Sequence, residues 1–520
     1  MPRAVARPAD AADVQALVRW AAAAGVPLIP RGAGSGMAGA NVGEGVVADL
    51  SALAPAVVVS ATGRTARTAA SVPLGALNAA AAPYGLRLPP DPSSGAWATV
   101  GGVIGTNAAG PRSMRYGSVR PWVLAAEVVT AEGEVVELRR GESVAAGVAA
   151  LRRFAEEAAP AILAARERVV ARWPRVRKSS TGYALDRWLE TGDVLDLVIG
   201  AEGTLGIVTA ATWRLDPLPT HRAALRLTLR RLEDLGEVIP MLVARRASAA
   251  ELLDQTFLRI IRETPAARAV GISGDEAGVV LVEFEGRSAD EVDAAARAAA
   301  ALAGPMGCDA QLALSPAELD ALLKVRKAAS PILAALPGRR SLQVVEDACV
   351  PVERIGEYVA AVREAAGRRG LDVVIFGHAG DGNLHVNLLP ELDRPDWPAQ
   401  VAGLYEEVTA AVVALGGVPS GEHGDGRLRA GALPAVFGEE IVALFRRVKH
   451  AFDPRGILNP GIKVDPSGPP VARLKAAPDA APIPDDIAQA LRRIEREGGY
   501  AEDRLALADG AGVQGPGSRV

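Results

Sequence analysis

The stretch RGAGSGMAGANVGEG, residues 31–45, decides the fold of the N-terminal half because it places six glycines in one loop. The loop lies between the apolar stretch Val26–Pro30 and the strand-like Val46–Leu50. Its backbone N–H groups can surround phosphate oxygens, so the loop predicts binding of a nucleotide diphosphate. A Rossmann unit needs a helix directly after the glycines, whereas a second strand follows here, and we therefore reject that fold. A loop that is merely flexible is the simpler alternative.

Two further glycine-rich blocks follow in the same half. PPDPSSGAWATVGGVIGTNAAG, residues 89–110, is rich in small hydroxyl and amide side chains, and IGAEGTLGIVT, residues 199–209, runs into a β-branched stretch. Three such blocks in one half predict a long ligand that is held in several places.

Three of the five histidines lie in two glycine-rich motifs of the C-terminal half, GHAGDGNLH (377–385) and GEHGDG (421–426). The first motif connects the apolar stretch Leu371–Phe376 to the alternating stretch Leu384–Leu389. This pattern predicts a tight turn between two strands, which brings the two histidines of the first motif together.

The two motifs predict a catalytic metal site. Two imidazoles, from His378 and His385, and the carboxylate of Glu422 leave open positions on a bound ion, and this donor set suits zinc, manganese or ferrous iron. Adjacent side chains in a loop diverge, so His423 is free to act as a base. The alternative is that these histidines cap turns or bond to backbone groups, as neutral imidazoles often do.

Seven motifs together resemble a known enzyme family. In chain order they are PRGAGSGMAG, PPDPSS, TVGGVIGTNAAGPRSMRYG, IGAEGTLGIVT, FGHAGDGNLH, GEHGDGR and FDPRGILNPG. This order is similar to the FAD-linked oxidases of the vanillyl-alcohol-oxidase type. It resembles in particular the branch of D-lactate dehydrogenases, glycolate oxidase flavin subunits and D-2-hydroxyglutarate dehydrogenases, over about residues 1–464.

The resemblance implies an α+β fold in three parts. Residues 1–215 would form a PCMH-type FAD-binding domain of two α+β subdomains, and residues 221–464 an α+β, ferredoxin-like cap of the FAD-linked oxidase C-terminal type. Residues 465–520 would form a tail with one docked helix, Asp485–Glu497, and a disordered end, residues 508–520.

The same motif match assigns the FAD contacts. The diphosphate would lie on the first glycine loop, and the flavin, its ribityl chain and the adenine on the other motifs: Arg31, Gly32, Ala33, Gly34, Ser35, Gly36, Met37, Gly39, Pro90, Ser93, Thr99, Gly102, Gly105, Asn107, Glu202, Gly203, Gly206, Ile207 and Asn459. Some relatives tether FAD through a histidine or cysteine. Here the first histidine is His221 and the only cysteines are Cys308 and Cys349, so we expect noncovalent FAD.

In the cap, the resemblance assigns metal ligands and substrate contacts. His378, His385 and Glu422 match the metal ligands, with zinc as the first expectation and manganese or iron as alternatives. His423 matches the catalytic base, Arg326 the arginine that holds the substrate carboxylate, and Asn383 a polar residue of the same site.

These residues imply oxidation of a 2-hydroxy acid to a 2-oxo acid, with hydride passing from the α carbon to the flavin. A metal would stabilise the developing alkoxide and His423 would take the hydroxyl proton. Relatives that act on a larger dicarboxylate often carry a lysine where this chain has residues 343–345, Gln-Val-Val, which favours a small substrate such as D-lactate or glycolate. Two alternatives remain: a noncatalytic FAD-binding subunit of a larger oxidase, and a metallohydrolase with a nucleotide regulatory domain.

Composition agrees with a multidomain enzyme of the cytoplasm. The 57 basic and 61 acidic residues nearly cancel, with no basic run, which argues against nucleic-acid binding. Two cysteines make neither a disulfide framework nor an iron–sulfur site, and we find no convincing membrane span. The electron acceptor stays open among a separate iron–sulfur subunit, a quinone, an electron-transferring flavoprotein and oxygen. Peripheral association with the inner membrane through a protein or quinone partner is an alternative to the cytoplasm.

Overall fold

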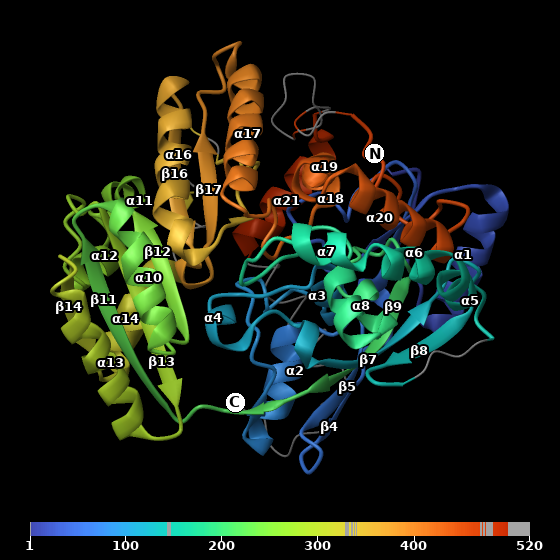
Figure 1. Ribbon diagram of the computed structural model, residues 1–520, viewed down its shortest axis with the longest axis horizontal. Helices are drawn as coiled ribbons and strands as arrows, with labels where there is room; N and C mark the ends of the chain where they lie inside the picture. The colour runs from blue at the N-terminus through green and yellow to red at the C-terminus, as the bar shows by residue number, and fades with distance from the viewer. Residues whose placement is uncertain are drawn as a thin grey trace.

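The computed structural model describes residues 2–142, 147–327, 341–468 and 482–497, together with positions 332, 333, 336, 339, 471 and 474. Over these residues the chain has the predicted α+β fold, and its strands form four sheets (Figure 1). Figure 1 shows the N-terminal elements, in blue and cyan, on one side and the middle of the chain, in green and yellow, on the other.

The first glycine loop connects two parallel strands of a small sheet. Strand β2 (Leu28–Arg31) pairs in parallel with β3 (Val46–Asp49), which also pairs with β1 (Ala4–Ala6). Helix α1 (Ala11–Ala24) precedes them, and its N-cap Asp10 accepts a hydrogen bond from the Asp13 backbone N–H, as its sequence predicts. Residues 32–45 contain no helix, so the rejection of a Rossmann unit is confirmed.

The second sheet of this half is antiparallel and five-stranded. Its order is β4 (Val57–Ser60), β5 (Thr65–Ala69), β9 (Ile207–Arg214), β7 (Val123–Val129) and β8 (Val135–Arg139). Among the helices of this half are α2 (Leu74–Ala81), α3 (Val100–Thr106), α4 (Ser113–Tyr116) and α8 (Leu185–Thr191). Of these, α3 begins in the second glycine-rich block and contacts β9, which places its small residues beside the first glycine loop.

Residues 433–464 pack against the N-terminal half of the chain. Helices α19 (Leu433–Phe437) and α20 (Glu439–Phe452) supply Phe437 and Phe445 to the same hydrophobic core as Trp213. In Figure 1 these red helices lie among the N-terminal elements. The GEHGDG and FDPRGILNPG motifs are therefore held against the glycine loops of the first half.

The largest sheet has seven antiparallel strands. Their order is β14 (Asp309–Ala313), β11 (His221–Leu229), β13 (Gly278–Gly286), β12 (Ala249–Asp254), β16 (Asp372–Gly377), β17 (Asn383–Leu389) and β15 (Ala348–Cys349). The first four strands, with α10 (Leu235–Ala244) and α13 (Ala289–Ala303), run β-α-β-β-α-β along the chain. This is the predicted ferredoxin-like cap.

Both faces of the large sheet are buried. Val280 and Val282 of β13 pack on one face with α10, α13, α16 (Ile355–Arg368) and α17 (Trp397–Ala414). Val279 and Leu281 pack on the other face with α11 (Gln255–Ile261), α12 (Pro265–Ala269) and α14 (Pro316–Lys327). The period-2 alternation of β13 fixes which side chains reach each helix layer.

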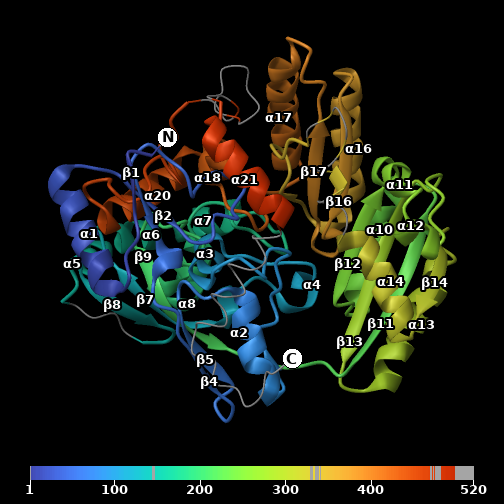
Figure 2. The same cartoon turned by 180° about the vertical axis from the view of Figure 1, so that it is seen from behind.

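Helix α21 (Asp485–Glu497) occupies the segment where the sequence predicts a helix. Figure 2 shows it beside α18 (Gly426–Arg429), yet its Ile487 and Leu491 are 44% and 40% exposed. The predicted disordered end, residues 508–520, lies outside the described residues. Within the described part of the chain, none of the helices has the length and hydrophobicity to cross a lipid bilayer.

Candidate active site

One cavity is lined by both halves of the chain. The N-terminal half contributes the glycine loop 31–37, small residues of the second block, and the turn around Glu202. The cap contributes Arg326, Gln343, Glu346, Phe376, His378, His385, Glu422 and His423. The predicted nucleotide-binding motifs and the predicted catalytic residues Arg326 and His423 therefore face the same space.

Most of the predicted FAD contacts line this cavity: Arg31, Gly32, Ala33, Gly34, Ser35, Gly36, Met37, Ser93, Thr99, Gly102, Gly105, Glu202, Gly203, Gly206 and Ile207. Gly39, Pro90, Asn107 and Asn459 are not among the described residues that line it. Asn459 is buried, and its amide donates to the carbonyls of Ala40 and Glu202. Asn107 donates to the Ser179 carbonyl in the same way. Asn459 therefore joins two loops that form the wall, and Asn107 ties the end of α3 to the loop around Ser179.

The wall of the cavity fits a nucleotide. A Cβ on Gly32 would stand 2.1 Å from Thr99 Oγ1, so only glycine permits this approach of the first loop to α3. Thr99 Oγ1 is buried and has no hydrogen-bond partner among the described residues. An orphaned hydroxyl beside a loop rich in N–H groups is suited to the polar groups of a dinucleotide.

A fully buried ion cluster fixes the position of the cap motif against these loops. Lys463 Nζ lies 3.0 Å from Glu202 Oε2 and 2.8 Å from Asp425 Oδ2. The carboxylate of Glu202 also accepts hydrogen bonds from the backbone N–H groups of Asp425 and Gly426. Burial raises the pKa of Glu202, although Lys463 opposes that shift.

The histidines converge as the sequence predicts. Strands β16 and β17 pair through Phe376 and His385, and the turn between them carries His378. The rings of His378 and His385 have centroids 5.0 Å apart, and those of His385 and His423 are 5.2 Å apart and stacked. Glu422 Oε1 lies 2.9 Å from His378 Nε2, 3.6 Å from His385 Nε2 and 3.7 Å from His423 Nε2.

Each imidazole is oriented through its Nδ1 atom. His378 Nδ1 lies 2.6 Å from a carboxylate oxygen of Glu251, and His385 Nδ1 lies 2.9 Å from the carbonyl oxygen of Glu346. His423 Nδ1 lies 2.8 Å from the Glu346 carboxylate. With the Nδ1 protons held in these hydrogen bonds, the Nε2 atoms of all three rings are turned toward Glu422.

The surroundings give the imidazoles different proton affinities. Burial, helped by the neighbouring imidazoles, lowers the pKa of His385, which therefore stays neutral. Burial also opposes protonation of His423, but Glu346 outweighs it and raises the pKa of His423 to about 9. For His378, Glu251 likewise outweighs burial and raises the pKa. The carboxylates Glu251 and Glu346 thus make His378 and His423 more basic than His385.

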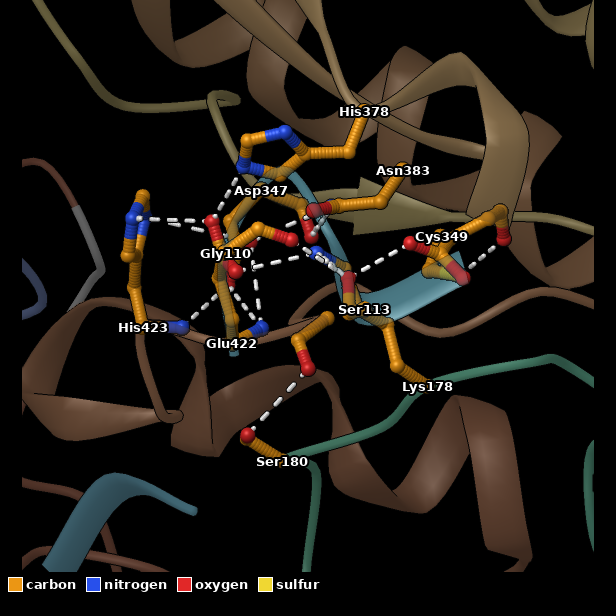
Figure 3. Close-up of polar contacts among 12 residues, drawn as sticks. Gly110, Ser113, Lys178, Ser180, Asp347, Cys349, His378, Asn383, Glu422 and His423 are labelled. Atoms are coloured by element: carbon orange, nitrogen blue, oxygen red, sulfur yellow. Dashed lines mark hydrogen bonds and ion pairs between the residues drawn. The ribbon is translucent and has the colours of Figure 1, made fainter. Parts of the chain in front are cut away.

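Lys178, a residue from the N-terminal half, contacts the cluster from behind. Figure 3 shows Lys178 among the polar contacts around Glu422. Its Nζ lies 2.9 Å from Glu422 Oε2, and its side chain is 1% exposed. Burial alone would raise the pKa of Glu422, but Lys178 and then His378 hold it well below its usual range. The Oε2 atom of Glu422 is therefore neutralised by Lys178, while its Oε1 atom faces the imidazoles.

Asp347 organises the loop that carries Glu422 and His423. Its carboxylate accepts hydrogen bonds from the backbone N–H groups of both residues and from Ser420 Oγ. Asn383 is fully buried and donates to Asp347 and to the Ala348 carbonyl, so it lies behind the cavity lining. The Asp347 carboxylate lies within 4.8 Å of His385, Glu422 and His423. Because its lone pairs are already used, we assign it to the loop and keep His378 as the third donor.

The donor set fits a divalent metal ion. His378 Nε2 and Glu422 Oε1 face each other at 2.9 Å. If the His378 ring is neutral with its proton on Nδ1, the lone pair of Nε2 points at a lone pair of Glu422 Oε1, which is repulsive. Only a proton or a cation between these atoms makes the contact favourable. Two imidazole nitrogens and one carboxylate oxygen are ligands that zinc, manganese and iron accept.

Arg326 lies on α14 at the edge of the cluster. Its Nε lies 2.6 Å from the second oxygen of Glu251, and its guanidinium stacks over the Phe376 ring at 4.9 Å. The described residues provide no acceptor for its Nη1 and Nη2 atoms. Arg326 lines the cavity, and the paired Nη groups of a guanidinium suit a carboxylate.

Comparison with known proteins identifies the chain's family. A family model described as "FAD binding domain" matches residues 2–139, and one described as "FAD linked oxidases, C-terminal domain" matches residues 218–462. The D-lactate dehydrogenase of Archaeoglobus fulgidus is 33% identical over 461 residues, covering 88% of this chain and 90% of the relative. The chain belongs to the FAD-linked oxidases.

Other relatives of this FAD-linked oxidase lie in the same branch. Glycolate oxidase subunit GlcD of Bacillus subtilis is 29% identical, with 89% of this chain and 88% of the relative covered. The D-2-hydroxyglutarate dehydrogenase of Pantoea ananatis is 30% identical over 89% of this chain, which spans about half of that relative's length (48%). The expected family and branch are thereby confirmed.

Solved structures support the fold. A 4-ethylphenol oxidase from Gulosibacter chungangensis superposes with a TM-score of 0.65 at 17% identity, with 88% of each chain covered. An alkyldihydroxyacetonephosphate synthase superposes with a TM-score of 0.63 at 16% identity, covering 88% of this chain and 76% of the other.

Sequence reasoning missed several residues of this FAD-linked oxidase's site. Glu251 and Lys178 carry no motif of their own, and Glu346 stands out only as part of an acidic pair. The one local signal for Glu251 is a carboxylate inside the apolar strand AAELLD, where burial is costly unless the charge has partners.

Proposed function

We propose that this FAD-linked oxidase oxidises a small 2-hydroxy acid, of the D-lactate or glycolate type, to the 2-oxo acid. One observation carries the proposal: a guanidinium, three imidazoles and Glu422 share one cavity with the FAD-binding loops. The relatives named for D-lactate, glycolate and D-2-hydroxyglutarate support the substrate class.

In the proposed reaction, Arg326 binds the substrate carboxylate through Nη1 and Nη2, which fixes the α carbon relative to the FAD-binding loops. His423 takes the proton of the substrate hydroxyl at Nε2. Glu346 holds the Nδ1 proton of His423 and stabilises the imidazolium that results. Asp347 keeps the His423 backbone in place during this transfer.

The cofactors complete the chemistry. His378, His385 and Glu422 would hold a divalent metal, zinc first. Bound FAD supplies the two-electron acceptor and the metal supplies a Lewis acid for the substrate hydroxyl. Neither Cys308 nor Cys349 is among the described residues that line the cavity, which supports noncovalent FAD.

The charges of the cavity support a monocarboxylate. Among the described lining residues the arginines are Arg31, in the nucleotide loop, and Arg326, and lysine is absent. Beyond the imidazoles themselves, the described lining near Arg326 offers no further cation for a second substrate carboxylate. Gln343 lines the cavity in the segment where relatives that use a larger dicarboxylate often carry a lysine.

We further propose that the reduced flavin passes its electrons to an external acceptor in the cytoplasm or at the inner membrane. An iron–sulfur subunit, a quinone, an electron-transferring flavoprotein and oxygen are the candidates. Reoxidation rates of the reduced protein with each of the four would rank them.

Anaerobic reduction of the flavin tests the proposal. The purified protein is mixed with D-lactate, L-lactate, glycolate or D-2-hydroxyglutarate, with and without a chelator, and its absorbance near 450 nm is followed. We expect rapid, chelator-sensitive bleaching by D-lactate or glycolate. A FAD-loaded and metal-loaded protein that none of the four acids bleaches would contradict the proposal.

A further inference from the structure

Glu251 is one buried carboxylate that contacts two functional groups at once. Its Oε1 lies 2.6 Å from His378 Nδ1, and its Oε2 lies 2.6 Å from Arg326 Nε. We infer that Glu251 is a positioning residue that orients a metal-ligand histidine and the substrate-binding arginine together. This inference rests on the proposed function for the role of Arg326.

The strand pattern explains how one residue reaches both groups. On β12, Ala250 and Leu252 face the core that contains α10, and Leu253 faces the opposite core. Glu251 therefore projects from the same side as Leu253, toward the layer that contains α14, from which Arg326 extends. Leu252 pairs with Gly377 of the neighbouring strand, which brings His378 next to Glu251.

The two contacts have separate consequences. The hydrogen bond to Nδ1 of His378 fixes its tautomer, so that the Nε2 lone pair is aimed at Glu422 and an ion. The contact with Nε of Arg326, together with the stacking on Phe376, holds the guanidinium plane and leaves Nη1 and Nη2 for a carboxylate. A single side chain thereby sets the relative position of the metal and the substrate carboxylate.

A purely structural role explains these contacts less well. Glu251 is 3% exposed inside an apolar strand, and burying a carboxylate there is costly. A leucine or valine would fill the strand without that cost. Both carboxylate oxygens are instead used by residues that line the cavity, and Glu251 itself does not line it. Glu251 therefore acts through His378 and Arg326.

The substitution Glu251→Gln separates these roles. The amide is isosteric, but it offers one acceptor oxygen and turns an NH2 group toward the other donor. We expect the affinity for Zn²⁺, measured by competition with a chromophoric chelator, to fall about 10- to 100-fold. We also expect the KM for the 2-hydroxy acid to rise about tenfold, while FAD content stays at the wild-type level. Unchanged Zn²⁺ affinity together with unchanged KM would refute the inference.

Two further variants sharpen the test. In an Arg326→Met background, Glu251→Gln should no longer raise KM but should still weaken Zn²⁺ binding, because its effect on the substrate passes through Arg326. Asp254→Asn is the matched control, since Asp254 lies on the same strand, is buried and accepts a hydrogen bond from the Phe257 backbone N–H, and neither residue is among the described residues that line the cavity; it should change neither quantity.

The experiment also distinguishes this inference from the proposed function. If no 2-hydroxy acid reduces the wild-type flavin, the proposed function fails, while the Zn²⁺ titration still decides whether Glu251 orients His378. If Glu251→Gln does not fold, Glu251→Asp retains the charge but is one methylene too short to span both donors. Wild-type Zn²⁺ affinity and KM in that variant would equally refute the inference.

Discussion

The buried Lys463 provides a stability prediction that is independent of the reaction. Its ammonium group is fully buried and contacts Glu202, Asp425 and the Ser180 carbonyl, at 2.7–3.0 Å. Lys463→Met keeps much of the apolar volume but leaves two adjacent carboxylates buried without their cation. Removing one partner of a buried ion pair costs about 3–5 kcal/mol. At about 2–4 °C per kcal/mol for a domain of this size, Tm should fall by about 6–20 °C.

The assay is thermal unfolding of the FAD-loaded protein, followed both by circular dichroism and by the fluorescence of released flavin. Arg446→Met is the control, because Arg446 forms an exposed ion pair with Asp465, two residues from Lys463 in sequence. Exposed pairs contribute about 0–1 kcal/mol, so this variant should melt within a few degrees of wild type. Adding Asp425→Asn to Lys463→Met should recover part of the loss. If Lys463→Met has the same Tm as the Arg446→Met control, the buried ion cluster does not contribute to thermal stability.

Three further predictions concern pH and metal. Because Glu346 raises the pKa of His423, Glu346→Gln should lower that pKa and shift the acid limb of kcat/KM to lower pH; an unmoved limb would contradict the assigned pairing. Burial raises the pKa of Asp254 from 3.8 to about 7, so this group costs stability as pH rises from about 4 to 7. Asp254→Asn should therefore raise the unfolding free energy in urea by about 2–4 kcal/mol at pH 8 and little at pH 4, whereas an equal gain at both values would rule out titration as the cause. Chelation should stop flavin reduction but leave FAD bound, so the flavin absorbance of the protein should not change. The reason is that the imidazole cluster and the nucleotide loop are separate sets of residues; release of FAD on chelation would contradict that separation.

Local patterns in the sequence predict much of the fold. The turn GHAGDGN lies between an apolar run and an alternating run, and the structure has the antiparallel pair β16 and β17 there. Asp10 caps α1 because it stands just before the apolar periodicity of the helix, and its side chain accepts a hydrogen bond from the backbone N–H of Asp13, three residues away. The glycine loop between β2 and β3 is also a local feature. These elements are predictable because their causes lie close together in the chain.

The supporting residues of the site are not predictable in this way. Glu251 contacts His378 across 127 positions, and Lys178 contacts Glu422 across 244. No sequence spacing predicts either contact, because each contact depends on how the cap sheet and the N-terminal half pack in three dimensions. The return of residues 433–464 to the first core follows from the packing of Phe437 and Phe445 and has no local signal. The sequence predicts most of the groups that line the cavity, but not Glu251 and Lys178, which contact those groups from outside the lining.

The two halves of the chain depend on each other at the cluster of His378, His385, Glu422 and His423. Glu422 lies in the C-terminal half, but the cation that neutralises its Oε2 is Lys178 of the N-terminal half. Ser113, also from the N-terminal half, donates to Asp381 of the turn that follows His378. The charge of the donor set is therefore balanced only when both halves are packed together. The same packing forms the cavity that faces the FAD-binding loops, so the imidazole cluster and the FAD-binding wall depend on the same contacts between the two halves.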